Sequence, residues 1–284
     1  MAYRFEHINT TLYFFMKPIV DTSALQEHSL VILRRDFITA SHCAFCPRKL
    51  PTNKALILAH PELGKVAAGP QCGPRWGIKP SEGLLDFTRR GMEEDAIPPA
   101  SAEQTLNEQM PERTGKTRTR VRAIEYLLLR TEKLPPLGFK NIARRELDAL
   151  YSVHRTRPLN DEEISRIQVI MKNCATHTDP DIKTRSYDSL MLAYTHAYWI
   201  DRCLEIGGRK LSLQNAERLD SFRKGLQRYR SLTIRQIEQL NRDLAYVFGE
   251  QAPKLKPDAF VPFRPGAGNV QQTRSPRFHN DKVS

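Results

Sequence analysis

Three cysteines in the first 72 residues of the chain constrain its fold more than any other feature. Cys43 and Cys46 stand in a C-x-x-C spacing, and Cys72 follows a Gly69–Pro70 pair. Two thiolates of one tight turn can bind the same ion, and a glycine–proline turn presents a third thiolate. Zinc takes four soft or borderline ligands in a tetrahedron, so this spacing predicts a zinc site that needs one more ligand.

Two histidines are placed to supply that fourth ligand. His60 lies between the C-x-x-C pair and Cys72, so a loop would bring it back to the ion. His42 adjoins Cys43, where sharing one ion strains the backbone. We therefore expect the ligand set Cys43, Cys46, Cys72 and His60, with His42 as the alternative. A redox-active C-x-x-C pair, or cysteines that bind no metal, are the other two interpretations.

The residues around the cysteines also follow a known order. The C-x-x-C pair, then Arg48–Leu50, then a spacer and Gly69–Cys72 resemble a short zinc-ribbon-like motif of uncharacterised phage and bacterial domains. The chain departs from that motif at two glycines, replaced by Pro47 and Ala68, and in a longer spacer. The resemblance covers residues 42–76. It implies a small metal-stabilised module in a phage or mobile-element setting, and it implies no reaction.

Basic residues are concentrated in the middle of the chain. The net charge is +12, and residues 112–158 alone hold twelve basic against five acidic side chains. A polyanion binder needs such a block, because each phosphate contact releases counterions. We therefore expect nucleic-acid binding, to DNA rather than RNA, through Arg118, Arg120, Arg122, Arg144 and Arg145. The other interpretation is a solvated helix face.

The same stretch begins a series of amphipathic helices. Apolar residues recur at helical spacing before and after the Pro135–Pro136 pair, and Asn160 begins a sequence typical of a capping box. A long helix is expected over residues 181–206, and two more helices are expected to begin at Ser212 and Thr233. Several helices of these lengths predict an α-helical bundle.

The predicted fold class is mainly α: a small N-terminal β-containing module stapled by zinc, then the helical bundle, then a disordered basic tail. The module takes residues 1–92, a polar, proline-containing linker 93–115, the bundle 116–250 and the tail 251–284. Two strands are expected where aromatic and β-branched residues gather, over residues 10–16 and 29–33. Two strands alone bury too little surface to be stable, so metal binding is expected to stabilise this module.

A group of aromatic and polar residues on the expected long helix offers a second way to bind nucleic acid. The group lies close together in sequence and comprises Tyr194, His196, Tyr198, Trp199 and Asp201. Such side chains can stack on an unpaired base. We favour the other interpretation, in which they are core residues with a hydrogen-bonded tip.

The sequence also bears on compartment and function. It lacks a run of about 18 apolar residues and a signal-peptide pattern. Five cysteines, three of them in metal-like spacing, suit a reducing compartment, so we expect a cytoplasmic protein with no membrane partner. No H-E-x-x-H or G-x-S-x-G motif is present. We expect a non-enzymatic, zinc-containing, nucleic-acid-binding accessory or regulatory protein; the alternative is a protein-interaction adaptor that docks its partner through the zinc module.

Overall fold

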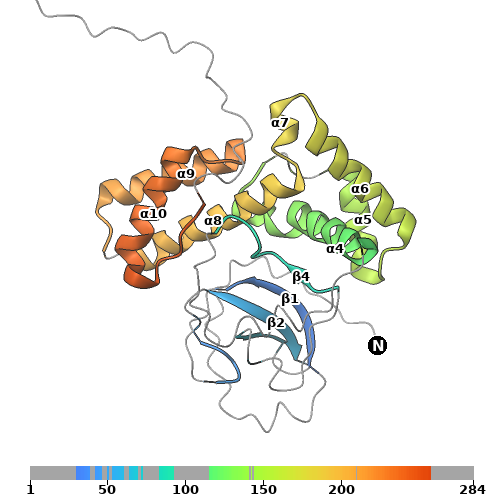
Figure 1. Ribbon diagram of the computed structural model, residues 1–284, viewed down its shortest axis with the longest axis horizontal. Helices are drawn as coiled ribbons and strands as arrows, with labels where there is room; N and C mark the ends of the chain where they lie inside the picture. Colours follow the sequence, from blue (N-terminus) through green and yellow to red (C-terminus); the bar gives the residue numbers. More distant parts are fainter. Residues whose placement is uncertain are drawn as a thin grey trace, which may run out of the picture.

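The computed structural model describes residues 30–38, 42–46, 50, 53–60, 64–69, 72, 83–92, 115–140, 142, 144–208 and 210–256. Within these ranges the chain is mainly α with a small four-stranded sheet in its N-terminal region, which confirms the predicted fold class at that level. The helices gather on one side of the molecule and the sheet on the other (Figure 1). The expected strand over residues 10–16, the linker over 93–114 and the tail after residue 256 lie outside the described residues.

The sheet has the strand order β3-β2-β1-β4. β1 (Val31–Phe37), β2 (Lys54–His60) and β3 (Gly64–Ala68) pair antiparallel, and β4 (Leu85–Asp86) runs parallel to β1. Apolar residues of β2 and β3 are buried together with Phe45 and Leu50 in a small core of their own. The apolar run that ends at His60 is therefore a central strand of the sheet.

Seven α-helices follow in the described part of the chain: α4 (Gly115–Leu128), α5 (Arg145–Thr156), α6 (Asp161–Thr176), α7 (Pro180–Lys183), α8 (Tyr187–Gly207), α9 (Leu213–Tyr229) and α10 (Ile234–Phe248). A π-helical turn, η1 (Leu129–Lys133), continues α4, and the 3-10 turn η2 (Pro135–Leu137) ends it at the two prolines. A second 3-10 turn, η3 (Gly249–Gln251), follows α10. Most buried apolar residues of the longer helices belong to one continuous hydrophobic core.

Polar caps begin the helices where the sequence places them. Asn160 and Glu163 form a reciprocal capping box at α6, and Thr233 and Gln236 form another at α10. The side chain of Ser212 accepts a hydrogen bond from the backbone N–H of Asn215 at the start of α9. Each bond satisfies a backbone donor that the first turn of a helix leaves unpaired.

The single long helix expected over residues 181–206 is wrong at its N-terminal end. The chain forms the short helix α7, makes a turn, and begins α8 only at Tyr187. Arg230, from the end of α9, reaches into this turn, where its Nε donates to Thr184 Oγ1 at 2.8 Å and its guanidinium pairs with Asp181. A distant arginine thus occupies the break between the helices, and no local pattern announces it.

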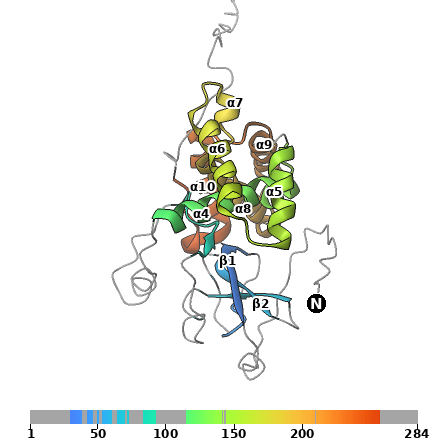
Figure 2. The same cartoon turned by 90° about the vertical axis from the view of Figure 1, so that its right-hand side faces the viewer.

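The sheet packs directly against the helices, in both Figure 1 and Figure 2. Phe37 of β1 stacks on Tyr198 of α8 with ring centroids 4.6 Å apart, and Phe37 also belongs to the helical core. The Tyr198 hydroxyl donates to the carbonyl oxygen of Ile38 at 2.6 Å. β4 lies between the rest of the sheet and α4, where Glu125 accepts the backbone N–H of Asp86.

A buried charge cluster lies at the same contact. Asp36 of β1 is 3% exposed and pairs with Arg34 and with Lys133 of η1. Its other oxygen accepts the Tyr194 hydroxyl at 2.8 Å. Burial opposes ionisation, but the charges of Lys133 and Arg34 prevail and lower the pKa of Asp36. A carboxylate at this depth stays charged because Lys133 of η1 and Arg34 of β1 place two positive charges beside it.

Candidate metal centre and basic surface

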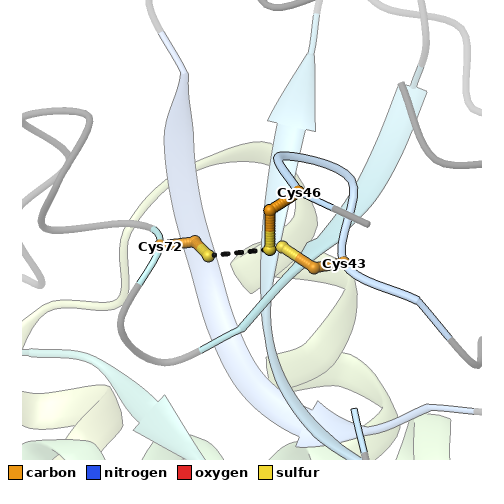
Figure 3. A group of neighbouring side chains, drawn as sticks. All are labelled: Cys43, Cys46 and Cys72. Atoms are coloured by element: carbon orange, nitrogen blue, oxygen red, sulfur yellow. Dashed lines mark hydrogen bonds between the residues drawn. The ribbon is translucent and has the colours of Figure 1, made fainter. Parts of the chain in front are cut away.

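Two loops at one end of the sheet bring three cysteines together. Cys43 and Cys46 lie on the loop after β1, and Cys72 lies just after β3 (Figure 3). Their sulfurs all lie within 4.8 Å of one another, and the Cys46 and Cys72 sulfurs are 3.5 Å apart. Cys43 is fully buried, whereas the other two are partly exposed. The three predicted thiol ligands therefore form a group that can hold a metal ion.

Backbone groups hold Cys43 in place. Its sulfur accepts the N–H of Phe45 at 3.4 Å and the N–H of Gly69 at 3.3 Å. Ala44 donates to the carbonyl oxygen of Ala67, which ties the C-x-x-C loop to β3. N–H donors stabilise the thiolate form of a cysteine and orient a ligand sulfur.

Gly69 is the pivot of the second loop. Its carbonyl oxygen accepts the N–H of Cys72 at 2.9 Å, which closes the turn predicted from the glycine–proline pair. A Cβ atom at this position would lie 3.2 Å from Leu50 Cδ2 and 3.9 Å from the Cys72 sulfur. The loop can pass this close to the buried Leu50 because residue 69 has no side chain.

Negative charges on the three neighbouring sulfurs would repel one another. Burial, followed by hydrogen bonding to Cys46 and the proximity of Cys43, raises the pKa of Cys72 to about 12. Three thiolates can coexist at this spacing only beside a cation.

Neither candidate for the fourth ligand joins the group in the described part of the chain. The backbone of His60 ends β2, and its side chain lies outside what the structure describes. His42 is partly exposed and is not a member of the three-cysteine group. Among the described residues, only Cys43, Cys46 and Cys72 form such a group.

The five predicted phosphate-binding arginines fall at two separate places. Arg120 pairs with Asp161 and donates to the carbonyl oxygen of Leu159, both beyond the C-terminal end of α5. Arg144 and Arg145 flank the N-terminal end of α5. A helix of 12 residues is about 18 Å long, so the structure does not bring the two groups together.

The arginines also differ in how free they are to bind another molecule. Arg118 and Arg145 are exposed and form no ion pair among the described residues. Arg122 lies 3.5 Å from Asp188 and over the ring of Tyr187, and Arg144 pairs with Glu146. Helical periodicity alone places these residues on the surface but does not reveal the acidic partners.

The aromatic group of α8 belongs to the core, as favoured from the sequence. Tyr194, His196 and Trp199 are all less than 10% exposed. Tyr194 and Tyr198 use their hydroxyls to hold β1. Stacking on a nucleic-acid base is not open to side chains this deeply buried.

The chain matches no protein-family model, no curated protein and no solved structure. None of the helices in the described ranges is both long enough and apolar enough to cross a membrane.

Proposed function

We propose that this protein binds zinc at a structural site and binds nucleic acid as a non-enzymatic accessory or regulatory factor. The observation that carries the proposal is the convergence of three cysteine sulfurs from two loops that are 26 residues apart in sequence. The motif resemblance adds the expectation of a phage or mobile-element setting. DNA is the favoured nucleic acid.

The spacing of the sulfurs favours zinc. Zinc–sulfur bonds of about 2.3 Å in a tetrahedron place sulfurs about 3.8 Å apart. The sulfurs here lie within 4.8 Å of one another and approach to 3.5 Å, so an ion fits with small adjustments of the loops. The two N–H groups that donate to the Cys43 sulfur would orient it and stabilise its negative charge when it binds a metal ion. With His60 as fourth ligand the coordination shell is closed, which suits a structural rather than a catalytic site.

The charge of the chain supports nucleic-acid binding. A net charge of +12 attracts a polyanion, and exposed arginines such as Arg118 contact phosphates without reading bases. We therefore expect affinity that depends strongly on salt and only weakly on sequence.

One experiment tests both parts. Metal content of the purified full-length chain is measured together with its binding to labelled DNA and RNA duplexes at about 50 and about 200 mM salt. We expect one zinc per chain and binding that weakens steeply with salt. Cys43→Ser should lose the metal, while Cys203→Ser, which changes a buried thiol of the helical core, should keep it. Zinc without salt-sensitive binding would contradict the nucleic-acid role and favour the adaptor function.

A further inference from the structure

An unbroken chain of contacts connects arginines from the sheet with arginines from the helices. Arg35 of β1 and Arg89, just after β4, both lie near Asp86, at 3.6 and 3.3 Å. Arg89 also lies 3.7 Å from Glu125 of α4, which accepts the hydroxyl of Tyr187 at 2.5 Å.

The chain of contacts continues on the other side of Tyr187. The guanidinium of Arg122 lies 4.8 Å from the centre of the Tyr187 ring and pairs with Asp188. Arg90 pairs with the same Asp188 oxygen at 2.9 Å. Arg118 lies one helical turn before Arg122, on the same face of α4. We call the following set the junction arginines: Arg35, Arg89, Arg90, Arg118 and Arg122.

Positive charge is in excess along this surface. Four of the five arginines lie beside three carboxylates, namely Asp86, Glu125 and Asp188, and Arg118 forms no ion pair among the described residues. One carboxylate oxygen of Asp188 serves two arginines, so neither guanidinium is fully neutralised. The side chains of Arg90 and Arg122 are 48% and 38% exposed, which leaves N–H donors free for a further anion.

The backbone beneath Arg90 is fixed in position. Thr195 of α8 donates to the carbonyl oxygen of Arg90 at 2.9 Å. Gly91 follows with a φ of +88°, and a Cβ there would lie 3.2 Å from Leu192 and Thr195. An arginine on a fixed backbone loses less conformational freedom when it binds a phosphate.

The N-terminal end of α5 offers no comparable excess. Arg144 and Arg145 are followed in the first turn by Glu146 and Asp148, and Arg144 pairs with Glu146. Two positive charges are thus matched by two negative ones.

We infer that the junction arginines form the surface that binds the phosphodiester backbone of nucleic acid, which rests on the proposed function. The surface combines residues of β1, of the segment after β4 and of α4, so it exists only when sheet and helices are packed together. It replaces Arg120, Arg144 and Arg145 of the predicted set with Arg35, Arg89 and Arg90.

The test compares three variants of the full-length chain with the wild type, using a short fluorescein-labelled DNA duplex over a series of salt concentrations. In Arg90→Ala/Arg122→Ala we expect weaker binding and a slope of log K against log salt that is shallower by about two units. Asp188→Asn should bind more tightly, because it frees both arginines. The matched control Arg144→Ala/Arg145→Ala should bind like the wild type. Thermal melting verifies that each variant is folded.

The outcomes separate this inference from the function on which it rests. If the wild type binds DNA but the junction variant binds equally well, the inference is overturned and the function stands. If Arg144→Ala/Arg145→Ala loses DNA binding instead, the inference is likewise overturned and the proposed function stands. If the wild type binds polyglutamate but neither DNA nor RNA, both are overturned and the surface serves an acidic protein. Tighter binding by Asp188→Asn supports the inference in a way that a purely structural role of these residues does not predict.

Discussion

The helical part and the cysteine end of the sheet are stabilised by different means. The helices α4 to α10 share one continuous core, with fully buried residues such as Trp199, Leu240 and Leu244. The sheet buries a smaller set of side chains, and β2 and β3 lie on the side away from the helices (Figure 1). A bundle of this size is stable through burial alone, whereas a small sheet needs further support.

The sheet is supported on two sides: an inner edge that faces the helices and an outer side that carries the cysteines. On the inner edge, β1 and β4 contact the helices through Phe37, Asp36 and Asp86. On the outer side, the described residues of the loops after β1 and β3 meet at the three cysteines, at the N–H group of Gly69 that donates to the Cys43 sulfur, and where Leu50 lies close to Gly69. Removing the metal should therefore affect β2 and β3 far more than the helices.

The largest expected effect is therefore that of Cys43→Ser. Structural zinc contributes on the order of 10 kcal/mol to small domains, so loss of a ligand should unfold the outer strands. Hydrogen exchange should show loss of protection in β2 and β3 while α8 and α10 remain protected. The control is Cys203→Ser, a buried thiol of α8. Unchanged exchange in a metal-free Cys43→Ser protein would remove the difference between the two regions.

The second effect concerns the inner edge. Asp36→Ala leaves Lys133 and Arg34 without their buried carboxylate, and breaking such a pair costs about 3–5 kcal/mol. Urea unfolding should show the loss, and a double-mutant cycle with Lys133→Met should show strong coupling. Asp148→Ala, at an exposed position of α5, should change stability by less than about 0.5 kcal/mol. Equal costs at the two positions would mean that the charge cluster does not join sheet and helices.

The third effect is a loss of stability at acid pH that arises in the helical core. Among the residues that the structure describes, His196 in the helical core finds no hydrogen-bond partner for either ring nitrogen, and burial lowers its pKa from 6.5 to about 4. The folded state thus favours the neutral ring, so its contribution to stability is complete above pH 6.5 and is lost as the pH falls toward 4. The gap corresponds to about 3 kcal/mol.

Urea unfolding of the wild type and of His196→Leu at a series of pH values measures this contribution. The wild type should lose stability relative to the variant between pH 6.5 and pH 4, and the difference should be constant above pH 7. Parallel curves over the whole range would show that His196 is not what makes the helical core sensitive to acid.

The smallest effect compares two glycines. Gly64 in the outer strand β3 has a φ of +71° and open space around its Cα, whereas Gly91 at the inner edge has a φ of +88° and close neighbours. Alanine at either position adopts the left-handed region at a cost of about 1–2 kcal/mol. Gly91→Ala should cost more than Gly64→Ala, because it also displaces Leu192 and Thr195. Equal shifts in Tm would indicate that the inner edge is packed no more tightly than the outer one.

Much of the helical fold was predictable because its signals are local. The caps at Asn160 and Thr233 and the apolar spacing along each helix lie within a few residues of one another. The C-terminal part of β1 was not predictable, because the sequence Arg34–Asp36 is too polar for an inner strand. The partners that allow its burial, Lys133 and Tyr194, lie 97 and 158 residues from Asp36.

The cysteine group and the basic surface likewise differ in how far the sequence predicts them. The convergence of the cysteines followed from their spacing and from the turn at Gly69. The basic surface did not follow, since helical periodicity cannot show that Asp161 engages Arg120 while Asp188 is shared by Arg122 and Arg90. The contribution of Arg35 and Arg89 depends on the packing of the sheet against α4, which only the folded structure reveals.

The X-ray absorption spectrum of the purified protein at the zinc edge reports directly whether Cys43, Cys46 and Cys72 bind zinc. The proposal predicts three sulfur neighbours at about 2.3 Å and one nitrogen at about 2.0 Å. In His60→Ala the nitrogen signal should change while the three sulfurs remain. A shell of oxygen and nitrogen alone, or a protein without zinc, would contradict the account of how Cys43, Cys46 and Cys72 stabilise the sheet.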